Sequence, residues 1–332
     1  MRDSSVDYSH NLKSYLQEFS EEYDVVEYEH FLLPFERSLF PSKTLFVARA
    51  SLLAHHYLRI RLPKPTYWLD RVRKAIRPGV LHPSLVKAGV AQAQKTIEEA
   101  DLVNVANRQD FQVLVESGIP ENKILVQPYG LSEQSIRKLG ALDANRKTSP
   151  RVAFIGTFDV RKGASEMPAI IDQLVQEIPG VCFRLLGTAA EFQTAEDVLK
   201  RLPQKHRSKI EVIPHYQSEQ LPSLLEDCAV GLFPSYLESF GFAALEMMMA
   251  SLPVAAYRAP GPSDFMPSDW LVQSGDSKGL VSLLSRWLKD PVFLENERRR
   301  ASTLAKTLTW EKVAISTSLL YKKAIEEKFS QI

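Results

Sequence analysis

The stretch RVAFIGTF, residues 151–158, is a short apolar run that ends at a glycine-containing turn. Four similar runs follow it along the chain: VCFRLLGT (181–188), KIEVIPHY (209–216), AVGLFPS (229–235) and LPVAAYR (252–258). Segments with helical spacing, such as SEMPAIIDQLVQEI (165–178), separate these runs. Apolar runs that alternate with helices predict βαβ units, so we expect a doubly wound α/β domain with a parallel sheet. No G-x-G-x-x-G is present in the sequence, which argues against a dehydrogenase-type dinucleotide site.

The length and composition set limits on the class of protein. The chain has 332 residues, a net charge of +1 and only two cysteines, Cys182 and Cys228. This length indicates two domains, the net charge gives no global reason to expect nucleic-acid binding, and two cysteines in apolar runs fit buried thiols in a reducing compartment. No stretch reaches the ~20 apolar residues of a membrane span, and the N-terminus lacks the apolar core of a secretory signal. We therefore expect a cytoplasmic protein, with peripheral attachment to a membrane left open.

The first half of the chain is less regular. Helices are expected at residues 9–23, 84–100 and 108–118, and strands at 24–30, 101–107 and 123–130, with a strand or turn running into a helix over 43–62. Residues 131–150 have little pattern, so the domain boundary is placed there. The expected organisation is an N-terminal domain (1–145), a C-terminal domain (146–310) and a C-terminal helix (311–332) that packs back on the N-terminal domain.

The segment ESFGFAALE (238–246) places a carboxylate at each end of the apolar start of a helix. A helix that starts after a parallel strand presents unpaired N–H groups and the positive end of its dipole, which suit a diphosphate. Eight residues of helix span ~12 Å, enough to separate a sugar from a ribose across a pyrophosphate. A carboxylate accepts two hydrogen bonds from a vicinal diol, so Glu238 and Glu246 suit a sugar nucleotide. The plainer alternative is a Glu238 favoured by the helix dipole and a solvated or paired Glu246.

The longer segment PSYLESFGFAALEMMMASLPV (234–254) resembles the donor-site segment of retaining GT-B glycosyltransferases of family 4, the group 1 glycosyl transferases. The resemblance implies two Rossmann-like domains that face each other across a cleft. It assigns the transferred sugar to Glu238 and the ribose of the donor to Glu246. Backbone amides near Ser239, Phe240 and Gly241 would contact phosphate or sugar oxygens.

A second segment, FIGTFDVRKG (154–163), resembles the first strand and turn of the same domain. It includes Gly156, and by the resemblance Lys162 holds the donor diphosphate. The family normally has an arginine where this chain has Thr157, and Arg161 is a candidate substitute. For Arg161 and Lys162 the alternative is a solvated turn.

Two further residues are assigned by position in the same resemblance. Gly261, in RAPGPSDFM (258–266), lies where the family has a loop that faces the donor sugar. His215, at the end of an expected strand, lies where the nucleobase would pack. An ordinary turn and a surface histidine are the alternatives.

The N-terminal half departs from the family pattern. Such enzymes open with a strand and a glycine-rich turn, whereas the first glycine here is Gly79. We therefore expect a truncated N-terminal domain, a missing part supplied by another chain, or a recorded start that is late. The family also places a histidine near the transferred sugar, and His55 and His56 are the candidates. Adjacent histidines on a helix point about 100° apart, so one of them at most is expected to face the cleft.

Residues 57–77 form a basic stretch with interleaved aromatic side chains. Such a stretch is typical of a patch that binds anionic lipid or an anionic acceptor, and a solvated face is the alternative. Single-stranded nucleic acid would use the same features, but no nucleic-acid partner is expected for this chain.

The sequence as a whole predicts a retaining glycosyltransferase of the hexosyltransferase type. It would transfer a sugar from a nucleotide-diphosphate donor to a hydroxyl of a glycan, lipid-linked or small-molecule acceptor. No metal ion and no cofactor are expected, because cations and helix dipoles stabilise the leaving diphosphate in this fold. The alternative is a catalytically degenerate GT-B protein that acts as a binding or regulatory partner. A sugar-nucleotide epimerase of the same fold is a third, less favoured reading.

Overall fold

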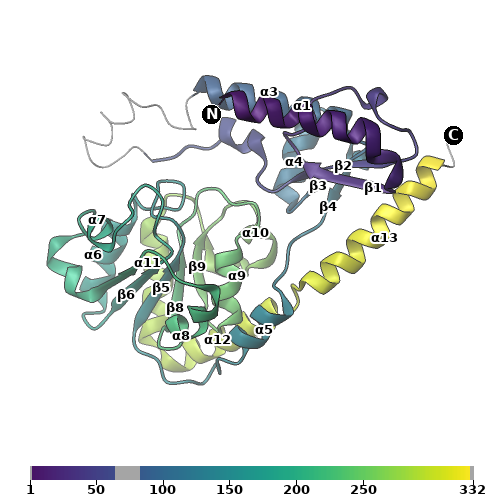
Figure 1. Cartoon of the computed structure of the whole chain (residues 1–332). Helices are drawn as coiled ribbons and strands as arrows, with labels where there is room; N and C mark the ends of the chain where they lie inside the picture. Colours follow the sequence, from purple (N-terminus) through teal and green to yellow (C-terminus); the bar gives the residue numbers. More distant parts are fainter. Residues whose placement is uncertain (1, 64–82, 330–332) are drawn as a thin grey trace. The chain divides into compact units, whose positions relative to one another are not determined.

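The computed structural model describes residues 2–63 and 83–329, which form two compact units (Figure 1). Of the described residues, 2–60, 83–129 and 311–329 belong to the first unit, and 61–63 and 130–310 belong to the second. Each unit contains one parallel sheet flanked by helices, so the predicted α/β class is confirmed.

The sheet of the second unit has six parallel strands in the order β10-β9-β8-β5-β6-β7. The strands are β5 (Arg151–Ile155), β6 (Cys182–Leu186), β7 (Ile210–Ile213), β8 (Val230–Phe233), β9 (Val254–Tyr257) and β10 (Leu271–Val272). Each of the five apolar runs predicted from the sequence therefore forms a strand. The strand order reverses between the neighbours β5 and β8, and ligands bind beyond the carboxyl ends of strands at such a switch point.

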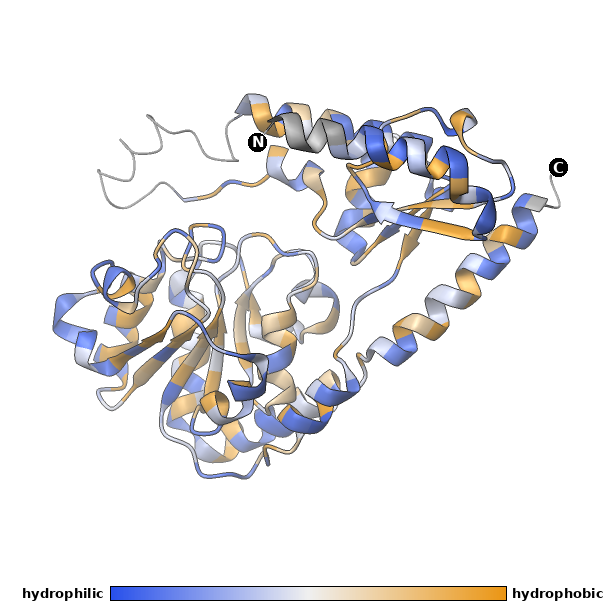
Figure 2. Ribbon diagram, in the orientation of Figure 1, coloured by the Kyte–Doolittle hydropathy of each residue, from blue (hydrophilic) through white to orange (hydrophobic). Residues whose placement is uncertain are grey.

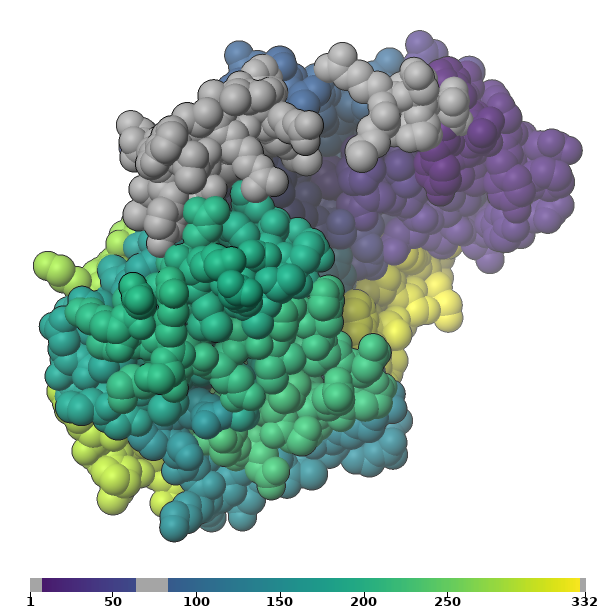
Figure 3. All heavy atoms as spheres, turned by 60° about the vertical axis from the view of Figure 1, so that its left-hand side comes forward, coloured from purple at the N-terminus to yellow at the C-terminus, as the bar shows by residue number. Residues whose placement is uncertain are grey.

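Helices cover both faces of this sheet. They are α5 (Glu133–Gly140), α6 (Met167–Glu177), α7 (Ala195–Leu199), α8 (Leu221–Leu225), α9 (Phe242–Met249), α10 (Pro262–Phe265), α11 (Ser277–Lys289) and α12 (Pro291–Ala305). Although α6 and α11 are distant in sequence, they pack together, and teal and yellow-green segments of this unit lie side by side on the face in Figure 3. Helix α5 occupies part of residues 131–150, where the sequence had indicated little regular structure.

Helix α9 packs in the interior of the second unit, against β8 and α12. Its residues Met247, Met248 and Met249 are fully buried. The ribbon of Figure 2 is correspondingly apolar along the strands of this sheet. A helix that is apolar on all sides belongs in a core, so the one charged residue of α9, Glu246, stands out.

The first unit has four parallel strands in chain order: β1 (Val25–Glu29), β2 (Leu45–Ala50), β3 (Leu102–Val105) and β4 (Ile124–Val126). Helices α1 (Arg2–Phe19), α3 (Pro83–Glu99) and α4 (Arg108–Glu116) belong to the same unit. Its core joins the sheet to these helices through buried side chains such as Leu16, Phe46, Ile97 and Leu114.

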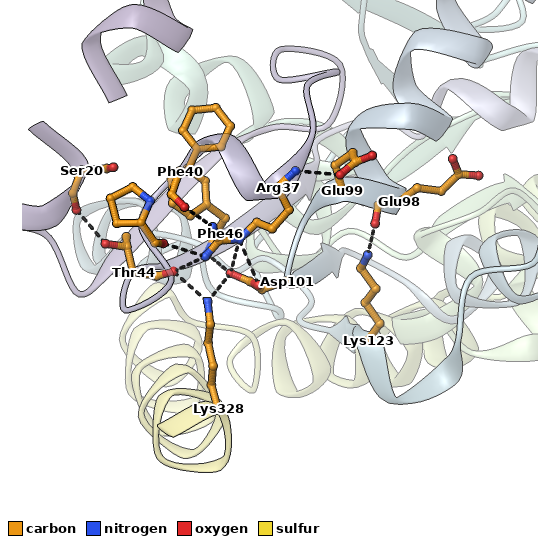
Figure 4. Close-up of polar contacts among 11 residues, drawn as sticks. Ser20, Arg37, Phe40, Thr44, Phe46, Glu98, Glu99, Asp101, Lys123 and Lys328 are labelled. Atoms are coloured by element: carbon orange, nitrogen blue, oxygen red, sulfur yellow. Dashed lines mark hydrogen bonds and ion pairs between the residues drawn. The ribbon is translucent and has the colours of Figure 1, made fainter. Parts of the chain in front are cut away.

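The last helix, α13 (Trp310–Phe329), attaches to the first unit by polar contacts at two levels. The Tyr321 hydroxyl accepts a hydrogen bond from the fully buried Asn104 amide at 2.9 Å and donates one to Glu27. Farther along the helix, Lys328 Nζ lies 2.9 Å from Asp101 Oδ2, and Arg37 contacts the same carboxylate from another element (Figure 4). These contacts link α13 to residues of the first unit that lie 217 to 294 positions earlier in the chain.

We predict that Tyr321→Phe lowers the free energy of unfolding by about 1–3 kcal/mol, because the buried Asn104 amide loses its acceptor. Urea denaturation of the full chain measures this. The control is Tyr8→Phe, whose ring is 56% exposed and whose removal of a hydroxyl should change stability by less than about 0.5 kcal/mol. Equal stability of Tyr321→Phe and the wild type would contradict the account of α13 docking.

Candidate functional site

The turn that follows β5 is pressed against the loop that follows β8. Gly163 has φ +85°, and a Cβ at this position would lie 2.3 Å from the carbonyl oxygen of Pro234. Within the turn, the Thr157 hydroxyl donates to Asp159 Oδ2 at 2.6 Å, and the Lys162 amide donates to Asp159 Oδ1 at 3.1 Å. The turn is therefore fixed internally, and only glycine at position 163 allows this close approach of the two loops.

This approach brings Lys162 and Glu238 together. Lys162 Nζ forms an ion pair with Glu238 Oε1, and their side chains are only 15% and 9% exposed. The ammonium also lies 5.6 Å from the centre of the Phe233 ring, and the stem of Lys162 passes beside Gly156. Ligands of such domains bind at the switch point of the parallel sheet, so the two charges of this nearly buried pair lie where a ligand would contact them.

Arg161 connects the same two loops in another way. Its guanidinium donates to the Leu237 carbonyl at 3.1 Å, and its own carbonyl accepts from the Tyr236 amide at 2.8 Å. The side chain is half-buried. In this structure Arg161 bridges the loops, while its predicted contact with a diphosphate stays a prediction.

The loops after β8 and β9 also interlock through glycine. Gly261 has φ +78°, and a Cβ there would lie 2.6 Å from Phe240 Cα; Gly241 has φ +95°, and a Cβ there would lie 2.8 Å from Pro262 Cγ. Phe240 is buried and packs on Phe265 with ring centres 5.1 Å apart. Ser239 is half-buried beside it. The backbone from 239 to 241 is thus held in one position directly before α9.

Glu246 lies in the second turn of α9 and is half-buried. No hydrogen bond or ion pair to its carboxylate occurs within residues 2–63 and 83–329. It lines a small hollow open to solvent, which is also lined by Gln134, Ser135 and Lys138 of α5 and by Ser218 and Glu219. Burial raises the pKa of Glu246 to about 7, because the charged form loses solvation and no described cation compensates for it. A carboxylate with such a pKa in a hollow is a candidate binding group.

His215, predicted to lie beside the nucleobase, is exposed. The next residue, Tyr216, is half-buried and close enough to Glu246 for that charge to act on it. Burial and, second, the Glu246 charge raise the pKa of Tyr216 to about 12. Tyr216 is not among the residues selected from the sequence, although its position shortly after β7, which ends at Ile213, is the signal that could have found it.

The histidine candidates belong to the first unit, in the 3-10 helix η3 (Ala54–Leu58) instead of an α-helix. His55 Nε2 lies 2.8 Å from Gln94 Oε1, and His56 Nε2 lies 2.6 Å from Asp110 Oδ1. Both rings are buried, and burial lowers the pKa of His55. Burial also raises the pKa of Asp110, an effect that the hydrogen bond from His56 opposes. Each histidine thus has a protein partner, and a role of either one toward a sugar remains untested.

Residues 2–63 and 83–329 contain no group of three or more histidine, cysteine or acidic side chains that could hold a metal ion. Within the same ranges, every helix is too short or too polar to cross a lipid bilayer.

The sequence profile described as "Glycosyl transferases group 1" matches residues 141–307, which is 167 of the 332 residues. The chain belongs to the glycosyl transferases group 1 family. The match contains both loops of the Lys162–Glu238 pair and all of α9. Helix α5 lies directly before the first matched residue in the sequence.

Curated relatives of this group 1 protein are distant. The chain is 26% identical over 252 residues to the MMP α-(1→4)-mannosyltransferase of Mycolicibacterium hassiacum. The aligned region covers 71% of this chain and 58% of the mannosyltransferase. The chain is 23% identical over 254 residues to a D-inositol 3-phosphate glycosyltransferase of Corynebacterium aurimucosum, covering 70% of this chain and 59% of the relative. The chain therefore spans a little more than half the length of these curated relatives.

Solved structures of similar fold cover nearly the whole group 1 chain. Sucrose-phosphate synthase from Thermosynechococcus elongatus superposes with a TM-score of 0.73 at 20% identity, over 98% of this chain and 79% of that one. Anabaena HepE in complex with UDP and glucose superposes with a TM-score of 0.62 at 17% identity, over 93% of this chain and 81% of that one. At these identities the likeness concerns the fold, and the predicted GT-B fold class is confirmed.

We predict that Gly163→Ala destabilises the chain by several kcal/mol, because the new Cβ clashes with the Pro234 carbonyl and the residue must keep a positive φ. Urea denaturation measures the loss. Gly118→Ala is a matched control, since Gly118 has φ +91° but a Cβ there meets nothing within 4 Å, so only about 1 kcal/mol of backbone strain is expected. Losses of the same size in both variants would refute the proposed contact between the loops.

We also predict that Glu246→Gln stabilises the ligand-free chain at pH 8 and leaves it unchanged at pH 4. The pKa of Glu246 is raised from 4.5 to about 7 in the folded state, so the folded protein holds the proton more tightly than the unfolded chain. The wild type therefore loses stability as pH rises from about 4.5 to 7, by on the order of 1–3 kcal/mol, and the neutral glutamine does not. Thermal melts across this pH range check it, and a constant difference at all pH values would contradict the unpaired state of Glu246.

Proposed function

We propose that this chain is a retaining glycosyltransferase that moves a sugar from a nucleotide-diphosphate donor to an acceptor hydroxyl. One observation carries the proposal. The switch point of the second sheet holds the Lys162–Glu238 pair, and the unpaired Glu246 follows eight residues after Glu238, within α9. A cation and two carboxylates match the diphosphate, the transferred sugar and the ribose of a sugar nucleotide.

Lys162 and Glu238 would change partners when the donor binds. Without a donor, each satisfies the charge of the other. In the complex, Lys162 would contact the diphosphate, whose charge grows as the bond to the sugar breaks, and backbone N–H groups from Ser239 to Gly241 would assist it. Glu238 would then accept hydrogen bonds from hydroxyls of the transferred sugar. This makes Glu238 a group that positions the donor, and Lys162 a group that stabilises the leaving diphosphate.

Glu246 would accept two hydrogen bonds from the ribose diol. Its pKa of about 7 means that binding must remove a proton below neutral pH, which weakens donor affinity there. Without a bound donor, the desolvated Glu246 carboxylate destabilises the fold locally, as residues of binding sites often do. Ligand binding relieves it by supplying the missing donors.

The finer features of the proposal rest on the sequence resemblance and on relatives. Retention of configuration, membership of family 4 and independence from metal ions come from the resemblance. The relatives named above are a mannosyltransferase and an inositol phosphate glycosyltransferase, and HepE was solved with UDP and glucose, which supports a nucleotide sugar and a hydroxylated acceptor. A cytoplasmic site of action, a sugar or lipid-linked acceptor, and contact with an anionic membrane surface through residues 57–77 complete the proposal. Residues 64–77 of that stretch lie outside the described residues.

One observation keeps a second candidate, a degenerate GT-B protein that binds the donor without transfer. Thr157 stands where the family has an arginine, and the Arg161 guanidinium is held by the Leu237 carbonyl. If Arg161 keeps this contact in the complex, only one side-chain cation of the turn, Lys162, serves the diphosphate. Binding and turnover must therefore be measured separately.

We predict that the wild type binds a nucleoside diphosphate, that Glu246→Ala weakens this binding about tenfold or more, and that Glu238→Gln abolishes sugar transfer with little effect on nucleotide affinity. Calorimetry with UDP and GDP measures binding, and donor hydrolysis or transfer to added acceptors measures turnover. His215→Ala, a change at an exposed residue, is the control. Binding without turnover in the wild type would favour the degenerate protein, and no binding of any nucleoside diphosphate would reject both candidates.

A further inference from the structure

Tyr236, in the loop after β8, hydrogen-bonds to two points of the turn that carries Lys162. This turn lies between β5 and α6, and residues 161–166 form its last part. The Tyr236 amide donates to the Arg161 carbonyl at 2.8 Å, and the Tyr236 hydroxyl donates to Glu166 Oε1 at 2.8 Å. Lys162 lies between these two points in the sequence. One tyrosine therefore holds both ends of the segment that presents the cation of the candidate site.

The Tyr236 ring is held in place by the sheet. It packs on the ring of Tyr257, the last residue of β9, with ring centres 5.2 Å apart and an interplanar angle of 65°. Tyr257 is fully buried. A Cβ on Gly275, in the loop after β10, would lie 3.6 Å from the Tyr236 hydroxyl oxygen, so this loop lies close to the polar end of the ring. Since an edge-to-face aromatic pair is directional, the end of β9 fixes the direction of the Tyr236 hydroxyl.

Glu166, which accepts the hydrogen bond of that hydroxyl, is fixed to the start of α6. Its amide donates to the Gly163 carbonyl at 3.0 Å, and its carbonyl accepts from the amides of Ala169 and Ile170 at 3.1 and 3.0 Å. Burial and, second, the hydrogen bond to Glu166 raise the pKa of Tyr236, so the hydroxyl keeps its proton and stays a donor. A hydrogen bond to a carboxylate is stronger than one between neutral groups, so this contact is suited to fixing a turn.

The contacts of Tyr236 matter because the proposed function separates Lys162 from Glu238. In the ligand-free protein, this ion pair joins the turn after β5 to the loop after β8. When the donor becomes the partner of Lys162, that link is lost, and the lysine must still be directed at the diphosphate. The contacts of Tyr236 use none of the groups that change partners, so they hold the turn throughout. A cation that is already in position stabilises the leaving group without a further ordering cost.

We propose that Tyr236 is a positioning residue that acts through Lys162: by holding both ends of the segment 161–166, it directs the ammonium at the diphosphate of the donor. The proposal rests on the proposed function and adds to it a residue that is assigned no contact with the donor. Glu166 is the second residue of this arrangement, because it accepts the hydrogen bond of the Tyr236 hydroxyl. A Glu166 that served only the N-terminal dipole of α6 would act independently of Tyr236.

The test measures how much the second phosphate of a nucleotide adds to binding. Calorimetry of the full chain with UMP and UDP, and with GMP and GDP, gives the ratio of diphosphate to monophosphate affinity. For Tyr236→Phe, which keeps the ring and loses the hydrogen bond, we expect this ratio to fall about three- to tenfold. Glu166→Ala should lower the ratio by a similar factor. Glu166→Gln still offers an acceptor and should restore most of the loss.

A double-mutant cycle separates an action through Lys162 from a general loss of structure. Lys162→Ala alone should lower the affinity ratio about tenfold or more. Tyr236→Phe added to Lys162→Ala should lower it no further, because the cation to be positioned is gone. Tyr8→Phe and Glu191→Gln change exposed residues of the first and second unit, and as matched controls they should leave the ratio unchanged. Thermal melts confirm that each variant is folded.

The outcomes separate the two proposals. If Lys162→Ala lowers the ratio but Tyr236→Phe leaves it unchanged, or if the two effects add in full, the proposed function stands and this inference is wrong. If Lys162→Ala leaves the ratio unchanged, or no nucleotide binds, the donor assignment fails and this inference fails with it. Should Tyr236→Phe not fold, the comparison of Glu166→Ala with Glu166→Gln, each in the presence and absence of Lys162→Ala, decides in the same way.

Discussion

The ion pair between Lys162 and Glu238 holds the centre of the second unit's site together. It joins the loop after β5 to the loop after β8, at the place where strand order reverses. Neither charge is well solvated, and removing one partner of such a pair leaves the other uncompensated, which is more costly than the pair itself is stabilising. The pair therefore keeps two poorly solvated charges in place at the switch point.

The sequence was sufficient for much of this architecture. Five apolar runs became β5 to β9, because strands buried on both faces of a parallel sheet must be apolar throughout. Glu246 could be selected because a charge in an otherwise apolar helix has few structural explanations. Helix α5 was missed because its residues 133–140 are mostly polar, and Leu139 is its buried residue.

Other features could not be read from the sequence because they depend on direction. His215 and Tyr216 are adjacent, and neighbouring residues of an extended chain point to opposite sides, so position alone does not say which one is exposed. The carbonyl partner of Arg161 is 76 residues away, and the partners of His55 and His56 are 39 and 54 residues away. Contacts between residues so far apart in the sequence depend on how whole helices and strands pack together. The local pattern of apolar and polar residues does not predict them.

The close approach of Gly163 to Pro234 has a practical meaning for anyone who wishes to alter this protein by mutation. The loops after β5 and β8 behave as one rigid part at that point, so random libraries that vary position 163 would consist mostly of misfolded members. Diversity placed instead on exposed positions of α5, such as Gln134, leaves that close contact intact.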